Sequence, residues 1–118
     1  MMTDALLGSF NLAEEIERFS PGTDSAGRRA ETLIKSDRLR VVLVTMRAGI
    51  TLHEHTAPGP ITIHTLRGRL VATVDGEERE LATGDLIALA SGVRHAVKML
   101  TDGAFLLTIA RGSKCGGT

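Results

Sequence analysis

Three of the four histidines lie in one short segment, which reads GITLHEHTAPGPITIHTLRG from Gly49 to Gly68. His53 and His55 are separated by one residue, and because successive side chains of a β-strand point to opposite faces, a strand here would project both imidazoles to the same side. Neutral imidazole is a common ligand of divalent transition metals. One strand cannot complete a coordination sphere, so a third ligand must come from elsewhere, and the fourth histidine, His95, is the candidate. The spacing therefore predicts a candidate metal site formed by His53, His55 and His95.

No other group of reactive side chains has a spacing that indicates a reaction. The sequence contains no Cys-x-x-Cys pair, no Walker loop and no Gly-x-Gly-x-x-Gly motif. Glu54 alternates away from the two neighbouring histidines, which makes it a weak candidate for a general base, and the acidic run DGEERE from Asp75 to Glu80 is typical of a solvated hairpin tip. We assign no catalytic residue from the sequence, and whether the protein is an enzyme is left open.

Short strands separated by glycines are expected to position these histidines. The run Val41 to Val44 is apolar and rich in β-branched residues, which is typical of a central strand. Glycines then recur at a spacing of roughly 8–12 residues, as in an all-β sandwich or barrel. Upstream, Ser9 is expected to cap one short amphipathic helix over NLAEEIERF. The strands expected after Gly49 are Ile50 to His55, Ile61 to Leu66, Leu70 to Val74, Glu78 to Leu81, Leu86 to Leu89, His95 to Met99 and Ala104 to Ala110.

Composition limits the kinds of partner. With 118 residues the chain is one domain, and its 14 basic and 14 acidic residues leave no positive field for a nucleic acid or an anionic membrane. Aromatic residues make up only 3%, which argues against stacking on bases. The single cysteine, Cys115, excludes an intramolecular disulfide, and the first residues show no secretion signal. We therefore expect a soluble, cytoplasmic protein whose partner is a small molecule.

This framework resembles the cupin family, here a small single-domain, RmlC-like member, whose double-stranded β-helix barrel carries two short motifs. In the first motif Gly49, His55 and Gly68 stand at the family's positions, while Ala57 replaces a second histidine and Ile61 replaces a glutamate. The first metal-binding motif is therefore degenerate.

The second motif is matched more closely. Gly84, Gly92 and His95 stand at the family's positions, while Ala90 replaces a proline and Met99 an asparagine. The resemblance, which covers roughly Leu39 to Ile109, implies a cupin jelly-roll barrel with a short N-terminal helix.

The resemblance also implies a site inside the barrel. Family members bind divalent zinc, nickel, iron or manganese, and here His53 would replace the missing histidine from the opposite side of His55. The barrel would enclose a pocket, for which the candidate lining residues are Ile61, Ile63, His64 and Leu89. Strict alternation from Ile61 sends His64 to the opposite face, unless a bulge intervenes. The expected function is small-molecule binding in a histidine-lined pocket, with a divalent metal as a possible mediator; the alternative is a metal-dependent enzyme similar to the family's dioxygenases and isomerases.

We expect the chain to be organised in three segments and to form a homodimer. Residues 1–28 form an N-terminal helix and loop, residues 29–112 the cupin barrel, and residues 113–118 a flexible tail. Cupins commonly pair through a sheet face or an exchanged strand, and the apolar segments around Val41 to Val44 and Ala30 to Ile34 offer area for such pairing.

Overall fold

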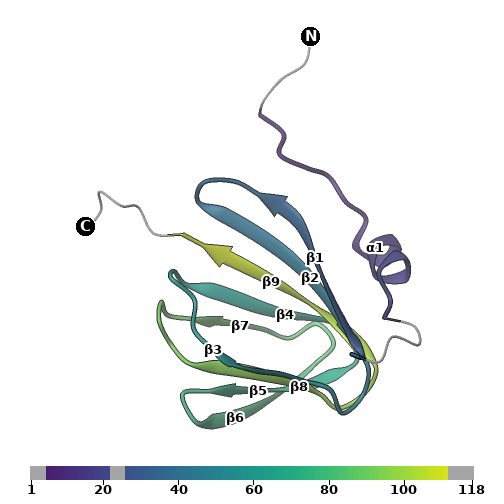
Figure 1. Cartoon of the computed structure of the whole chain (residues 1–118), viewed down its shortest axis with the longest axis vertical. Helices are drawn as coiled ribbons and strands as arrows, with labels where there is room; N and C mark the ends of the chain where they lie inside the picture. Colours follow the sequence, from purple (N-terminus) through teal and green to yellow (C-terminus); the bar gives the residue numbers. More distant parts are fainter. Residues whose placement is uncertain (1–4, 22–25, 112–118) are drawn as a thin grey trace.

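Two β-sheets and one short helix form the structure, a computed structural model that describes residues 5–21 and 26–111 (Figure 1). The helix, α1, is Leu12–Arg18. Among the described residues the strands are β1 (Arg28–Lys35), β2 (Leu39–Met46), β3 (Thr51–His55), β4 (Ile61–Arg67), β5 (Arg69–Val74), β6 (Glu77–Ala82), β7 (Leu86–Leu89), β8 (His95–Met99) and β9 (Gly103–Ala110).

The chain passes back and forth between the two sheets. The larger sheet has the order β1-β2-β9-β4-β7 and the smaller one the order β3-β8-β5-β6. All the paired strands are antiparallel. This is a jelly-roll arrangement, and the predicted all-β fold with one short helix near the N-terminus is confirmed.

Alternation along each strand separates the two faces of the larger sheet. On β2, Val42, Val44 and Met46 are buried in the core between the sheets, whereas Leu43 belongs to a second cluster on the other face. The apolar run at this place is therefore buried on both sides, as its composition predicts for a central strand.

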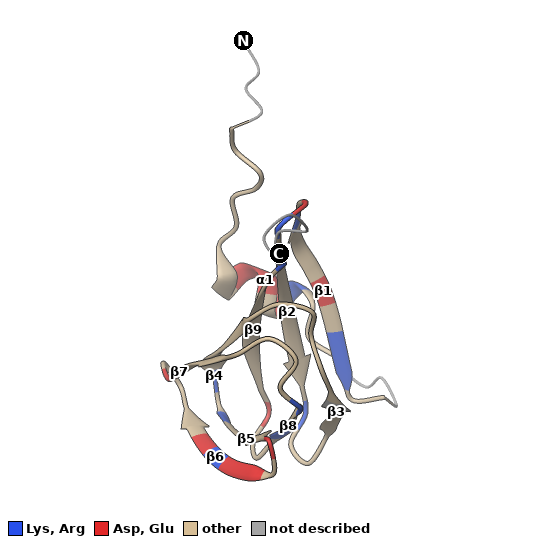
Figure 2. Cartoon of the chain, turned by 90° about the vertical axis from the view of Figure 1, so that its left-hand side faces the viewer, with Lys and Arg blue, Asp and Glu red and all other residues tan. Residues whose placement is uncertain are grey.

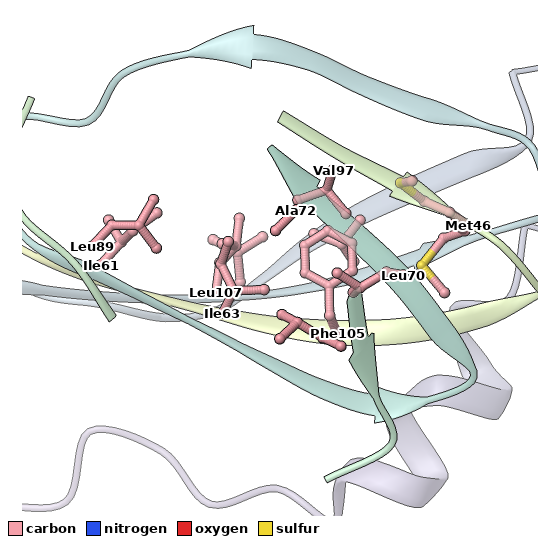
Figure 3. Close-up of a cluster of buried hydrophobic side chains, with 13 residues drawn as sticks. Met46, Ile61, Ile63, Leu70, Ala72, Leu89, Val97, Phe105 and Leu107 are labelled. Atoms are coloured by element: carbon pink, nitrogen blue, oxygen red, sulfur yellow. The ribbon is translucent and has the colours of Figure 1, made fainter. Parts of the chain in front are cut away.

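Core side chains form a continuous row along the inside of the barrel. Figure 3 shows Ile61 and Leu89 at one end, Leu107 in the middle, and Phe105 and Met46 toward the other end. Each side chain of this kind stabilises the fold by roughly 1.5–3 kcal/mol when it is fully buried. The Ile61 end of this row is the end at which the candidate site lies.

The helix covers the outer face of the larger sheet, and it begins later than the sequence predicts. Its N-cap is Asn11, whose Oδ1 accepts a hydrogen bond of 3.0 Å from the backbone N–H of Glu14. Ser9 is therefore wrong as the cap, because the side chain that reaches the third helical amide is that of Asn11. Ile16 packs with Leu43 and Ala104 in the outer cluster.

Exposed acidic side chains mark β6, the edge strand of the smaller sheet (Figure 2). Glu77, Glu78 and Glu80 are all exposed there. Charges along an edge strand oppose its pairing with a strand of another chain.

The predicted tail at 113–118, which contains Cys115, lies outside the described residues. Within residues 5–21 and 26–111, no helix has the length and apolar character needed to cross a membrane.

Candidate functional site

Strands β3 and β8 bring two histidines face to face at one end of the barrel. His55 is the direct cross-strand partner of His95, and the centroids of the two rings are 4.3 Å apart with an angle of 63° between the ring planes. A β-bulge between Leu52 and His55 produces this pairing, because a regular ladder that continues from the Leu52–Val97 pair would place residue 54 opposite His95. Bulges commonly re-aim a side chain in this way.

A backbone carbonyl holds each of the two rings. Nδ1 of His55 lies 2.7 Å from the carbonyl oxygen of His53, and Nδ1 of His95 lies 3.1 Å from that of Val93. Because a carbonyl oxygen only accepts hydrogen bonds, Nδ1 carries the proton in each neutral ring. Nε2 is then the ring nitrogen with a free lone pair, able to accept a hydrogen bond from a ligand.

The two rings differ in burial. His95 is 3% exposed, whereas His55 is exposed. Burial lowers the pKa of His95 below its usual value of 6.5, the hydrogen bond with Val93 opposes this shift, and the nearby charge of His55 adds to it. The His95 imidazole is therefore predominantly neutral at neutral pH.

Both rings border a cavity of about 160 Å³. Its apolar wall includes Ile61 and Leu107, which belong to the core row of Figure 3, and Ile109, which packs against the core. The full lining is Arg40, His55, Thr56, Ala57, Pro58, Ile61, His95, Leu107, Ile109 and Arg111.

Two arginines complete this cavity, and the sequence reasoning missed both. Arg40 stands on β2 two residues before the inward-facing Val42, and Arg111 stands two residues beyond Ile109, just after β9 ends. A signal for Arg40 was present in the sequence. By strand alternation its side chain is on the inward-facing side of the strand, where the other side chains are apolar, and a charged residue stands out there. Arg111 offers no such signal, because it follows the strand.

The structure separates the predicted metal ligands. His53 is exposed and does not line the cavity; its carbonyl group contacts His55 instead. The bulge breaks the alternation on which the same-side placement of His53 and His55 depended. Of the three predicted ligands, the cavity thus brings together His55 and His95.

The predicted pocket residues also lie in different places. Ile61 lines the cavity, while Ile63 and Leu89 are buried in the core. His64 pairs with Leu86 and with Leu106 on the outer face of the larger sheet, where it is half-buried. Strict alternation along β4 explains this position of His64, because Ile61 and Ile63 face inward.

The residues at the cavity do not fit a resident divalent metal ion. Catalytic zinc sites take three protein ligands, and among the described residues no three histidine, cysteine or acidic side chains are grouped so that they could hold a metal. The cavity is lined by two histidines and two arginines and by no acidic residue, and the positive charge of the arginines opposes that of a cation.

A larger cavity, of about 260 Å³, lies between α1, the end of β2 and the start of β9. Its charged groups have partners in the chain. Glu17 pairs with Arg67 at 2.8 Å, and Asp102 accepts a hydrogen bond from the backbone N–H of Ala48. The charged side chains of this cavity are therefore less available to a ligand than the two imidazoles of the smaller cavity.

Comparison with known proteins connects this geometry to a family. A family model described as a cupin domain matches residues 42–110, which is more than half of the chain. No curated protein matches the sequence significantly.

Solved structures with the same fold include three that differ in length and identity. An RmlC-like cupin from Shewanella frigidimarina is 19% identical, with a TM-score of 0.73 and coverage of 96% of this chain and 97% of that chain. An RmlC-like cupin from Desulfovibrio desulfuricans is 25% identical, with a TM-score of 0.69 and coverage of 93% and 96%. A salicylate 1,2-dioxygenase variant from Pseudoaminobacter salicylatoxidans is 16% identical, with a TM-score of 0.76 and coverage of 91% of this chain but only 37% of that chain.

Proposed function

The chain belongs to the cupin domain family, and we propose that it binds a small molecule in the cavity between His55 and His95 without a resident metal ion. The observation that carries this proposal is the pair of facing imidazoles. Each has Nδ1 held by a backbone carbonyl, so that Nε2 is left for a ligand, and both rings border one cavity. Side chains oriented in this way are preorganised for a ligand.

The volume of the cavity limits the size of its ligand. At about 160 Å³ it is similar to the engineered cavities of about 150 Å³ that accept one benzene molecule. A ligand with on the order of six to ten non-hydrogen atoms fits this space. Its apolar part would contact Ile61, Leu107 and Ile109, and its polar part the imidazoles.

The second candidate is a metal-dependent enzyme of the dioxygenase or isomerase type. A salicylate 1,2-dioxygenase shares the fold, but at 16% identity this likeness carries no activity over to the present chain. The cavity lacks the third protein ligand that such a centre takes. We therefore favour binding without metal over metal-dependent catalysis.

A ligand screen on ¹⁵N-labelled protein tests the proposal. Small sugars, keto acids and aromatic acids are added one at a time, and we expect ligands to shift amide signals of residues in β3, β8 and the end of β9. An Ala57→Phe variant places a large ring in the cavity and should abolish these shifts while the protein stays folded.

His53→Ala is the matched control, because this histidine lies next to the site without lining the cavity. Binding that survives Ala57→Phe, or shifts that gather around α1 and the larger cavity, would show that the ligand site lies elsewhere.

A further inference from the structure

We propose that the cavity recognises a small hydroxycarboxylate, whose carboxylate pairs with Arg40 and Arg111 and whose hydroxyl group donates a hydrogen bond to Nε2 of either His55 or His95. This inference rests on the proposed small-molecule binding and adds the chemical class of the ligand.

Positive charge without a carboxylate partner is the first observation. The described part of the chain contains the ion pairs Arg18–Glu15, Arg67–Glu17 and Arg69–Glu80, and none of these three involves Arg40 or Arg111. Within the described residues, the side chain of Arg40 donates a long hydrogen bond of 3.4 Å to the hydroxyl of Thr32. The net charge of the chain is zero, so two arginines that line one cavity, both of them exposed, are a local concentration of positive charge and not part of a general excess. An anion in the cavity would relieve their mutual repulsion.

The two arginines are spaced for one shared anion. Arg40 on β2 is the cross-strand partner of Ile109 on β9. Arg111 follows Ile109 by two residues, so Arg40 and Arg111 are diagonal neighbours across the two strands. Diagonal neighbours on antiparallel strands are about 7–8 Å apart, a distance that long side chains bridge. The planar guanidinium group forms paired hydrogen bonds with a carboxylate, which the ammonium group of lysine cannot do.

The imidazoles define the second group of the ligand. Their Nε2 atoms accept hydrogen bonds, so the ligand must present an O–H or N–H donor. An amine would be protonated near neutral pH, and its charge would be repelled by the two arginines beside it. A hydroxyl group donates a hydrogen bond to one imidazole and carries no charge that the arginines would repel, while inorganic phosphate has no apolar part to contact Ile61, Leu107 and Ile109.

Three related probes test this assignment by calorimetric or NMR titration. Lactate carries the carboxylate and the hydroxyl group, lactamide replaces the carboxylate by a neutral amide, and propionate lacks the hydroxyl group. We expect lactate to bind at least about tenfold more tightly than lactamide and several-fold more tightly than propionate. Inorganic phosphate should bind more weakly than lactate.

Variants connect the affinity to the named side chains. Arg40→Gln and Arg111→Gln should each weaken lactate binding by about tenfold, and Arg40→Lys, which keeps the charge but loses the fork, by less. Arg79→Gln is the matched control: Arg79 is an exposed arginine on β6 that does not line the cavity, and its loss should leave the affinity unchanged. Thermal melting checks that each variant is folded.

Two results would overturn the inference while leaving the proposed function intact. One is equal binding of lactamide and lactate at the cavity, and the other is binding of neutral molecules there with no response to any of the three carboxylate or phosphate probes. Failure of every small molecule to shift the residues around His55 and His95 would instead contradict both proposals.

Discussion

His55 and His95 face each other across one strand pair, yet they meet very different surroundings. His95 is 3% exposed and its pKa is lowered by burial, whereas the ring of His55 is exposed. The pair therefore combines one imidazole that stays neutral at neutral pH with one that solvent reaches. The cavity lining includes no acidic residue, so these two rings supply its imidazole acceptors beside the two arginines.

The burial of His95 predicts how stability depends on pH. Its pKa is near 6.5 in the unfolded chain and lower in the folded protein, so below pH 6.5 the unfolded chain binds a proton that the folded protein does not. The contribution to the free energy of unfolding is thus fully present above pH 6.5 and is lost as pH falls toward the folded-state pKa, by at most about 1.4 kcal/mol per pH unit for one proton. Urea unfolding of the wild type and of His95→Gln between pH 5 and 8 measures this difference.

His53→Gln is the control for this measurement, because His53 is exposed. The wild type should lose more stability on acidification than His95→Gln does, and His53→Gln should follow the wild type. Parallel curves for the wild type and His95→Gln would show that His95 is not the group responsible.

Two structural features, the bulge in β3 and the helix α1, determine the geometry of the barrel around the site. The bulge in β3 turns His55 toward His95 and leaves His53 exposed. The helix α1 closes the outer face of the larger sheet through Ile16, which packs on Leu43 and Ala104. One element therefore assembles the site, and the other stabilises the sheet that carries both arginines.

The packing of α1 leads to a prediction about stability. Ile16→Ala should lower the free energy of unfolding by about 2 kcal/mol, because Ile16 is 9% exposed and its truncation leaves a partly filled space against Leu43. Asn11→Ala should cost about 1 kcal/mol through loss of the helix cap. Chemical denaturation measures both values.

Leu100→Ala is the comparison for the same kind of truncation at a more exposed position, since Leu100 is 42% exposed. Its cost should be clearly smaller than that of Ile16→Ala. Equal costs for the two variants would mean that α1 does not pack firmly on the sheet.

At the scale of the whole molecule, the two apolar segments used to predict a homodimer differ in burial: around Ala30 to Ile34, Ala30 is exposed and Leu33 and Ile34 are half-buried. The run Val41 to Val44 is largely buried within the chain, with Val42 and Val44 in the core and Leu43 in the outer cluster with Ile16. The large apolar side chains that are most exposed are Leu6 at 70%, and Leu7 and Leu86 at 60% each. Figure 1 shows the segment before α1 running from the helix toward the N-terminus, and Gly8 within it lies close to the side chain of Ile34 on β1.

We still propose a homodimer, with this N-terminal segment at the contact. Sedimentation equilibrium at micromolar concentration should give the mass of two chains, and a Leu6→Ser, Leu7→Ser double variant should shift the protein to monomer because the apolar contact is lost. Leu100→Ser, at a separate exposed apolar position, should remain dimeric. A wild type that sediments only as a monomer would refute the proposal.

Local sequence pattern was sufficient for the fold. Alternation and glycine spacing located the strands closely, as for Ile61 to Leu66 against the observed Ile61–Arg67, because strand periodicity and turn preferences are properties of a few neighbouring residues. The helix was also located, although its start was misplaced from Asn11 to Ser9, since both residue types are good caps.

The sequence named His55, His95 and Ile61 as site residues, and the tertiary structure decided the rest of the cavity lining. The bulge that exposes His53 arises from the register between β3 and β8, and no local pattern in TLHEH predicts it. Arg40 and Arg111 meet His55 and His95 only because the pairing of β2 with β9 carries both of them to the same end of the barrel. Strand periodicity repeats every two residues and can therefore be recognised from neighbouring residues alone. The chemistry of this site depends instead on which distant strands lie side by side and in which register.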